Sequence, residues 1–197
     1  LLAALVTVLF LMSVLWGTAE IPIITFLDVL LGNESPTGII LLELRLPRAI
    51  LALAVGASLG MSGAALQGLL RNPLAEPGIL GVSSVSVLFS TLVLYFGIGT
   101  TSSLLLPISA IAGALLATAF LTLAAIFTRS VVTLILIGVG ITSFSGALMS
   151  LVLNFAPNPF TLADLVNWTL GSVANRSLTD LAYALPFILS GMGLLLW

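Results

Sequence analysis

Two arginines near the start of the second apolar stretch are the residues of this sequence best placed to bind a charged group. They stand three positions apart, in Arg45-Leu46-Pro47-Arg48, so both side chains emerge on one face of a helix that begins here. The amino end of a helix is unfavourable for cations unless an anion compensates. Glu43 or lipid phosphate could compensate, and so could an acidic partner that docks through bidentate carboxylate pairs.

Polar side chains inside apolar stretches form a second group with chemical potential, because an unsatisfied polar atom at membrane depth is costly. Serines and threonines, such as Ser83 and Ser84, can bond to a carbonyl of the preceding turn. We do not expect Gln67 and Asn154 to satisfy their amide groups in this way. We therefore carry these two residues as candidates for lining a translocation path.

The residue types that are missing exclude several kinds of chemistry. The sequence has no cysteine and no histidine, which removes thiol chemistry, zinc sites and imidazole catalysis. The run Gly138-Val139-Gly140 lies inside an apolar stretch, and no Walker-type Gly-Lys-Ser/Thr sequence exists. We expect no catalytic residue, metal or cofactor in this chain, and any ATP that is used must bind a separate ATPase chain.

The segment from Arg71 to Gly78 separates two apolar stretches and carries two prolines and a glycine. Asn72 can cap backbone groups there, and Pro73 and Pro77 restrict the chain to a fixed turn. Together with Glu76, these residues are predicted to form a tight connection between two helices.

Membrane helices must position these residues. The chain is 60% hydrophobic and 6% charged, with a mean hydropathy of +1.31, whereas a soluble domain has about 25% charged residues. The predicted fold class is an all-α, polytopic transmembrane bundle that forms one domain over 1–197. Apolar runs of the length that a bilayer requires place six spans near 1–17, 48–70, 79–96, 107–127, 131–154 and 181–197.

Three further points concern the nature of the first span, the short helices outside the spans and the orientation in the membrane. Residues 1–17 could instead be the apolar region of a signal peptide, but no basic segment precedes them. An interfacial helix is predicted at 24–31 and a short capping helix at 161–170. Arginines do not decide the orientation, because two (Arg71 and Arg129) lie on one predicted side and three on the other.

Small residues recur every fourth position in three of the predicted spans, those near 48–70, 107–127 and 131–154. Such a stripe lets a neighbouring helix approach closely, which is the usual basis of helix packing in membranes. The positions predicted to pack in this way are Gly56, Gly60, Ala64, Gly68, Gly138 and Gly146.

Three segments together resemble the FecCD-type permeases of bacterial ABC importers. They are Leu44 to Arg48, the Gly56, Ser62 and Gln67 positions of the second span, and the run from Asn72 to Val82. The segment from Trp168 to Ser172 is also similar to that family. FecCD-type permeases take up iron siderophores, haem and cobalamin.

The resemblance implies a homodimer of permeases in the bacterial cytoplasmic membrane, each of roughly ten helices. Two cytoplasmic ATPase subunits and an extracytoplasmic substrate-binding protein would complete the importer. The turn at 71–78 would be cytoplasmic, and Arg45 and Arg48 would be external and receive acidic residues of the binding protein. Asn154, Trp168 and Gly171 would border the path. The chain would be the amino-terminal portion of such a permease.

Two other classes of function remain to be compared with this one. A channel or secondary transporter that works without ATP fits the composition equally well, although the intramembrane charges that secondary transporters use for coupling are not evident. A membrane enzyme would need a clustered acid–base or nucleophilic set within the spans, and the scattered serines do not form one.

Overall fold

The computed structural model describes residues 1–17, 31, 36–98, 104–128 and 130–197, and every regular element among them is a helix. The predicted interfacial segment at 24–31 lies outside these residues except for Leu31, and so does Arg129. The described part of the chain contains no strand. The predicted all-α class is therefore confirmed.

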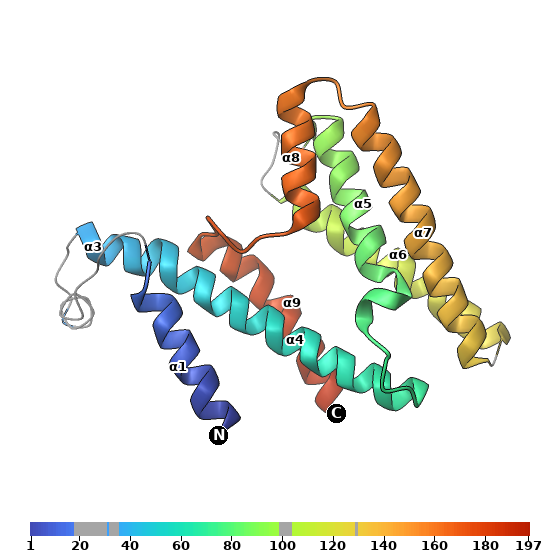
Figure 1. Ribbon diagram of the computed structural model, residues 1–197, viewed down its shortest axis with the longest axis horizontal. Coiled ribbons are helices and arrows are strands. Elements are labelled where there is room, and N and C mark those ends of the chain that lie inside the picture. Colours follow the sequence, from blue (N-terminus) through green and yellow to red (C-terminus); the bar gives the residue numbers. More distant parts are fainter. Residues whose placement is uncertain (18–30, 32–35, 99–103, 129) are drawn as a thin grey trace. The chain divides into compact units, whose positions relative to one another are not determined.

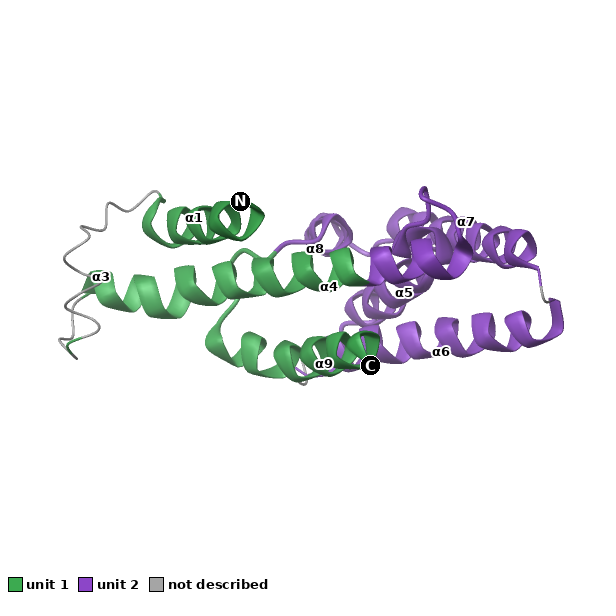
Figure 2. Ribbon diagram, turned by 90° about the horizontal axis from the view of Figure 1, so that it is seen from below, with its two compact units in different colours: residues 1–61, 173–197 green, residues 62–172 purple. Residues whose placement is uncertain are grey.

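The chain divides into two compact units, residues 1–61 with 173–197, and residues 62–172 (Figure 2). The first unit contains α1 (Leu2–Leu15), α3 (Pro36–Ile39), η1 (Ile40–Arg45), most of α4 (Leu46–Leu70) and α9 (Leu178–Leu196). The second contains the end of α4, η2 (Pro77–Leu80), α5 (Val82–Tyr95), α6 (Leu105–Thr128), α7 (Val131–Asn154) and α8 (Pro159–Leu170) (Figure 1).

Four helices among the described residues are long and apolar enough to cross a membrane. They are the helix Pro36–Leu70, which joins α3, η1 and α4, and the helices α6, α7 and α9. The apolar helices α1 and α5 are shorter, so a helix lies at each of the six predicted spans. Large apolar side chains such as Leu116, Phe120 and Phe144 are exposed, as expected of helix faces that contact lipid.

The helix that contains Pro47 begins earlier than the sequence predicts. Proline favours a helix start near residue 48, because it lacks an N–H and its ring collides with the carbonyl of the fourth residue before it. The structure instead widens the preceding turn into a π-helix, η1, in which the Leu46 N–H donates to the Leu41 carbonyl. This extra residue in the turn lets one helix run from Pro36 through Pro47 to Leu70.

The starts of three other helices follow from side chains that cap free N–H groups. Ser130 and Asn158 accept hydrogen bonds from the backbone in the first turns of α7 and α8, and Pro159 occupies the first position of α8, where no N–H is needed. Ser177 and Asp180 form a reciprocal capping box at the start of α9.

The core of the first unit lies where α1 meets η1 and the start of α4. Val14 packs with Leu41 and Ala49, and all three are buried. Phe10 and Ile40 cover this cluster. The contact therefore joins the end of α1 to the π-helical turn, two segments that are far apart in the sequence.

The second unit is built around α5, which contacts α6, α7 and α8 (Figure 1). Hydroxyl groups bridge α5 to α6: Ser86 Oγ donates to the Ala110 carbonyl at 2.8 Å, and Ser90 Oγ to the Leu106 carbonyl at 3.3 Å. A Cβ atom at Gly113 would lie 2.9 Å from the Val85 carbonyl oxygen. These two serines therefore hold α5 and α6 together, and the same bonds satisfy the donors of their own hydroxyl groups.

The segment η2 lies directly on α7 because both sides of the contact are glycines. A Cβ atom at Gly138 would lie 2.7 Å from the Ile79 carbonyl oxygen and 2.8 Å from Leu80 Cα. On the facing side, Gly81 has a φ of 77°, which disfavours any other residue, and a Cβ there would lie 2.8 Å from Ile141 Cγ2. This contact fixes where α5 begins.

Gly138→Ala should destabilise the protein, whereas Gly140→Ala should not. The added methyl at 138 would lie within 2.8 Å of the η2 backbone, which would then have to shift, and overpacking of this kind costs about 1–3 kcal/mol. A Cβ at Gly140 meets nothing within 4 Å, so that change should be neutral or stabilising by up to ~1 kcal/mol. Thermal unfolding of the intact protein in detergent would measure both, and equal midpoints would contradict the assigned contact.

Candidate functional site: a hydroxyl-lined pocket and a buried arginine

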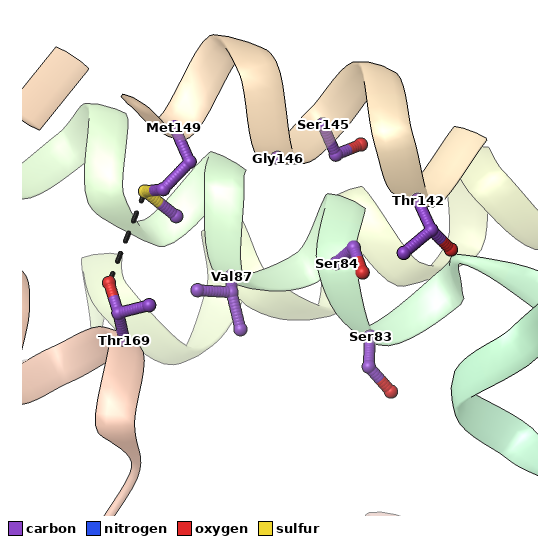
Figure 3. Close-up of a pocket in the computed structure, with 8 residues that line it drawn as sticks. All are labelled: Ser83, Ser84, Val87, Thr142, Ser145, Gly146, Met149 and Thr169. Carbon is purple, nitrogen blue, oxygen red and sulfur yellow. Dashed lines mark hydrogen bonds between the residues drawn. The ribbon is translucent and has the colours of Figure 1, made fainter. Parts of the chain in front are cut away.

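An open pocket of about 310 Å³ lies between α5, α7 and α8 of the second unit (Figure 3). Five of its lining residues carry a hydroxyl group, one is a glycine, and two are apolar. They are Ser83, Ser84, Val87, Thr142, Ser145, Gly146, Met149 and Thr169. No ionisable side chain is among these lining residues, so the pocket can form hydrogen bonds without carrying charge.

The first end of the pocket is set by the contact between η2 and α7. Ser83 and Ser84 lie two and three residues after Gly81, whose backbone conformation starts α5. Opposite them, Thr142 Oγ1 donates to the Gly138 carbonyl at 3.0 Å. At this end of the pocket, both walls therefore lie next to the contact between η2 and α7.

The other end of the pocket is formed by α8. Leu165 is fully buried and anchors this helix. Thr169 Oγ1 donates to the Leu165 carbonyl at 2.8 Å and lies 4.0 Å from Met149 Sδ, a contact that joins α8 to α7 (Figure 3). Between the two ends, Ser145 is only 3% exposed.

The residues predicted to line a path are not the ones that line this pocket. Asn154 is exposed at the end of α7, and Trp168 is half-buried next to Thr169. Gly171 ends α8 with a φ of 72°, and a Cβ added there would meet nothing within 4 Å. Their role in a path stays a prediction.

The pocket residues give only a weak signal in the sequence. The sequence favours self-satisfied helix turns for Ser83 and Ser84, and nothing in it distinguishes Ser145 or Thr169 from other hydroxyl residues. A Cβ at Gly146 meets nothing within 4 Å, and this residue lines the pocket. Its predicted packing against another helix stays a prediction. Which side chains of a helix meet in a pocket depends on which helices are its neighbours, and the sequence alone does not state this.

The connection after α4 has the predicted tight geometry. The Asn72 N–H donates to the Gln67 carbonyl at 3.2 Å and the Arg71 N–H to the Gly68 carbonyl at 3.4 Å, which is a Schellman motif. Arg71 takes the left-handed position of the motif with a φ of 47°, where glycine is usual. Asn72 Oδ1 accepts from the Leu74 N–H at 3.0 Å.

Gln67 belongs to this connection. Its Nε2 donates to the Pro73 carbonyl at 3.0 Å, so its amide is used to hold the turn. Beyond Pro73, Glu76 accepts the Ile79 N–H at its backbone carbonyl, and Pro77 is the first residue of η2. The path role predicted for Gln67 has no support from this placement.

The predicted small-residue stripe of α4 is an open face in the described structure. Gly56, Gly60, Ala64 and Gly68 are exposed, and Cβ atoms added at the three glycines would meet nothing within 4 Å. Of the glycines predicted to pack, Gly138 alone has a neighbour against its Cα among the described residues. The packing role of the α4 stripe stays a prediction.

Arg45 is buried, with 6% of its surface exposed. Its Nη1 donates to the Leu15 carbonyl at 2.8 Å and to the Val14 carbonyl at 3.3 Å. These are carbonyls at the carboxyl end of α1, which has negative potential, so a guanidinium is favourable there. The group also lies against Gly17, where a Cβ would be 2.7 Å from Nη2.

The expectation that the two arginines stand at the amino end of a helix is wrong. The helix begins at Pro36, so Arg45 and Arg48 lie inside it, and no unfavourable end potential acts on them. The structure also separates their surroundings, since Arg45 is buried against α1 whereas Arg48 is half-buried. The docking role of the pair stays a prediction.

Comparison with known proteins gives a consistent result over nearly the whole chain. Residues 5–197 match the model of the FecCD transport family. The chain is 37% identical to the iron(3+)-hydroxamate import system permease protein FhuG of Bacillus subtilis, over 93% of the chain and 57% of that protein. It is 37% identical to the molybdate import system permease protein MolB of Haemophilus influenzae, over 76% of the chain and 44% of MolB.

A solved structure supports the same relationship. It is an inward-facing conformation of a transporter assigned to the metal-chelate type of ABC transporters, with a TM-score of 0.81 and 31% sequence identity. The match covers 95% of this chain and 57% of that chain. The chain thus spans about half the length of the relatives it matches.

Arg45→Gln should destabilise the intact protein by about 1–3 kcal/mol, because the last carbonyls of α1 lose a charged donor. Gly17→Ala should reproduce part of this loss without altering Arg45, since the new methyl displaces the guanidinium. Arg48→Gln is the matched control and should stay within ~0.5 kcal/mol of the wild type. Thermal unfolding in detergent measures all three, and an equal loss from Arg48→Gln would refute the assignment.

Proposed function

The chain belongs to the FecCD transport family, and from that premise we propose that it forms part of the translocation path for an iron-siderophore-type complex in an ATP-driven importer. It is a multi-pass membrane permease of a bacterial ABC importer type, and not itself an enzyme. Haem and cobalamin are further possible cargoes of the same kind.

The observation that carries the proposal is the match of residues 5–197 to the family, together with the likeness to a metal-chelate type transporter. The choice of cargo draws on the relative named as an iron(3+)-hydroxamate permease, of which this chain covers more than half. The uncharged pocket of the second unit fits an organic chelate better than a bare ion, because it offers hydroxyl groups and no counter-charge.

The proposal requires partners that this chain does not contain. A second copy of the permease would complete the path, two cytoplasmic ATPase subunits would bind and hydrolyse ATP, and an extracytoplasmic binding protein would deliver the cargo. Asn154, Trp168 and Gly171 are proposed to border the path between the two copies. The chain itself would carry no cofactor.

The proposed orientation places the 71–78 turn in the cytoplasm and the start of the Pro36–Leu70 helix outside. Arg48 is then the cation offered to acidic residues of the binding protein, because it is half-buried and remains near the surface. Arg45 serves the same surface indirectly, since its guanidinium holds the end of α1 in place.

Uptake of a ferric hydroxamate into proteoliposomes should require ATP, the binding protein and an active ATPase. The intact permease would be reconstituted with its ATPase subunits and assayed with radiolabelled iron. A variant ATPase that binds but does not hydrolyse ATP should reduce uptake to background, because the permease has no energy source of its own. Uptake that persists without ATP would point to a channel or secondary transporter instead.

Arg48→Glu should weaken the affinity of the binding protein by tenfold or more, about 1.4 kcal/mol, because it replaces attraction to an acidic partner by repulsion. Arg71→Glu changes charge equally at the proposed cytoplasmic turn and should leave the affinity unchanged. The affinity of the wild type should also fall as salt is raised. Surface plasmon resonance on nanodiscs measures these values, and unchanged affinity in Arg48→Glu would rule out docking at this residue.

A further inference from the structure

The hydroxyl-lined pocket lies beside the part of α7 that a membrane-spanning helix places far from water. Its α7 residues, Thr142 to Met149, fall in the middle and carboxyl half of α7, which is one of the helices long enough to cross a membrane. Polar groups at such depth are costly unless they bond to something. Hydroxyl groups from three helices nevertheless gather around this one pocket, and no buried side-chain oxygen among the described residues lacks a partner.

The hydroxyl groups of the pocket are not equivalent. Thr142 and Thr169 donate their protons to carbonyls of their own helices, so they offer lone pairs to a ligand. Ser145 is almost fully buried and lies between them on the pocket wall. A serine hydroxyl both donates and accepts, and the set as a whole can therefore bond to carbonyl, amide and hydroxyl groups.

Charge limits what the pocket can hold. None of its lining residues is ionisable, so a bare oxyanion or cation would lose hydration there without gaining a counter-charge. A ligand whose charge is already neutralised, such as a metal wrapped by organic donor atoms, avoids that cost. Met149 and Val87 add an apolar wall for the carbon skeleton of such a ligand.

A compact ligand suits this pocket better than a further transmembrane helix. The contact between Thr169 and Met149 joins α8 to α7 at one end (Figure 3), and the η2 segment lies on α7 beyond the other end. A helix that packs along α5 and α7 would need both ends open. The volume of about 310 Å³ is at the lower end of the range for small-molecule pockets, which suits one arm of a chelate.

We propose that this pocket is a subsite that holds an uncharged, oxygen-bearing arm of an organic metal chelate during transport, with Ser145 as its central hydrogen-bonding group. The inference rests on the proposed function, since it assumes that the chain transports a chelate. It adds a position in the chain, a set of residues and a ligand chemistry to that function.

The test is uptake by the intact permease, reconstituted with its ATPase and binding protein, of three probes: a ferric hydroxamate, vitamin B12 and molybdate. Gly146→Leu fills the pocket and should lower the initial uptake of the transported chelate about tenfold or more. Gly140→Leu is the matched control, because Gly140 lies on the same helix outside the pocket and a Cβ there meets nothing within 4 Å. Its uptake should stay within about twofold of wild type.

A second pair of variants guards against a failure of Gly146→Leu to insert. Ser145→Ala removes the buried hydroxyl and should reduce chelate uptake several-fold, whereas Ser150→Ala, which removes an exposed hydroxyl bonded to the Gly146 carbonyl, should not. The affinity for the binding protein and the basal ATPase rate should be unchanged in Ser150→Ala.

The possible outcomes separate the subsite from the broader function. Equal uptake in both members of each pair would overturn the subsite while leaving the importer intact. Uptake of molybdate without uptake of either chelate would overturn the ligand chemistry. If the wild-type complex transports none of the three probes with ATP, the proposed function fails and the subsite fails with it.

Discussion

The constraint on which this structure depends is that lipid offers no hydrogen-bonding partner, so each polar group must be satisfied within the protein. Most of the described backbone meets this requirement by forming helices. The side chains meet it by bonding to backbone carbonyls, as Ser86 does across two helices and Thr142 within one. Within the described residues, no buried side-chain nitrogen or oxygen atom lacks a partner.

The same constraint explains the unusual start of the long helix. Proline at position 47 removes one donor and obstructs a carbonyl, which in water would favour ending the helix. In apolar surroundings, ending the helix would leave further backbone groups without hydrogen bonds. The widened turn at 40–45 therefore costs less free energy than a helix end. Arg45, the last residue of that turn, then binds the free carbonyls at the end of α1. The π-helical turn at 40–45 is thus linked through Arg45 to the carboxyl end of α1.

The sequence predicts the helices well because their signals are local. The predicted span at 131–154 matches α7, since a long apolar run follows a serine cap. The second span is predicted to start too late, at residue 48, because local rules do not include the option of a π-helical turn. The residues of the 44–82 segment are specific enough to indicate the family by themselves, and the match over 5–197 confirms it.

The site could be predicted less well, because its residues are brought together only by helix neighbours. Gly56 and Gly138 stand in similar stripes of small residues, yet Gly138 lies against η2 and Gly56 lies open. In α7, Ser145 is buried in a pocket wall while Ser150 is exposed. Gln67 has the character of a path residue, but its amide binds the Pro73 carbonyl. The sequence states which residues are small or polar, but not what they face.

The two ends of the pocket are held by different kinds of contact, and this difference bears on how the width of the pocket could change. At one end, Gly138 is in contact with the backbone of η2, and its carbonyl also accepts the Thr142 hydroxyl. Closely packed backbone of this kind cannot shift without breaking the contact. At the other end, α8 meets α7 through a hydroxyl 4.0 Å from a thioether sulfur, which is a weak and adaptable contact. A change in pocket width at the contact between Thr169 and Met149 therefore costs less than one at η2, whereas the fully buried Leu165 keeps α8 itself anchored.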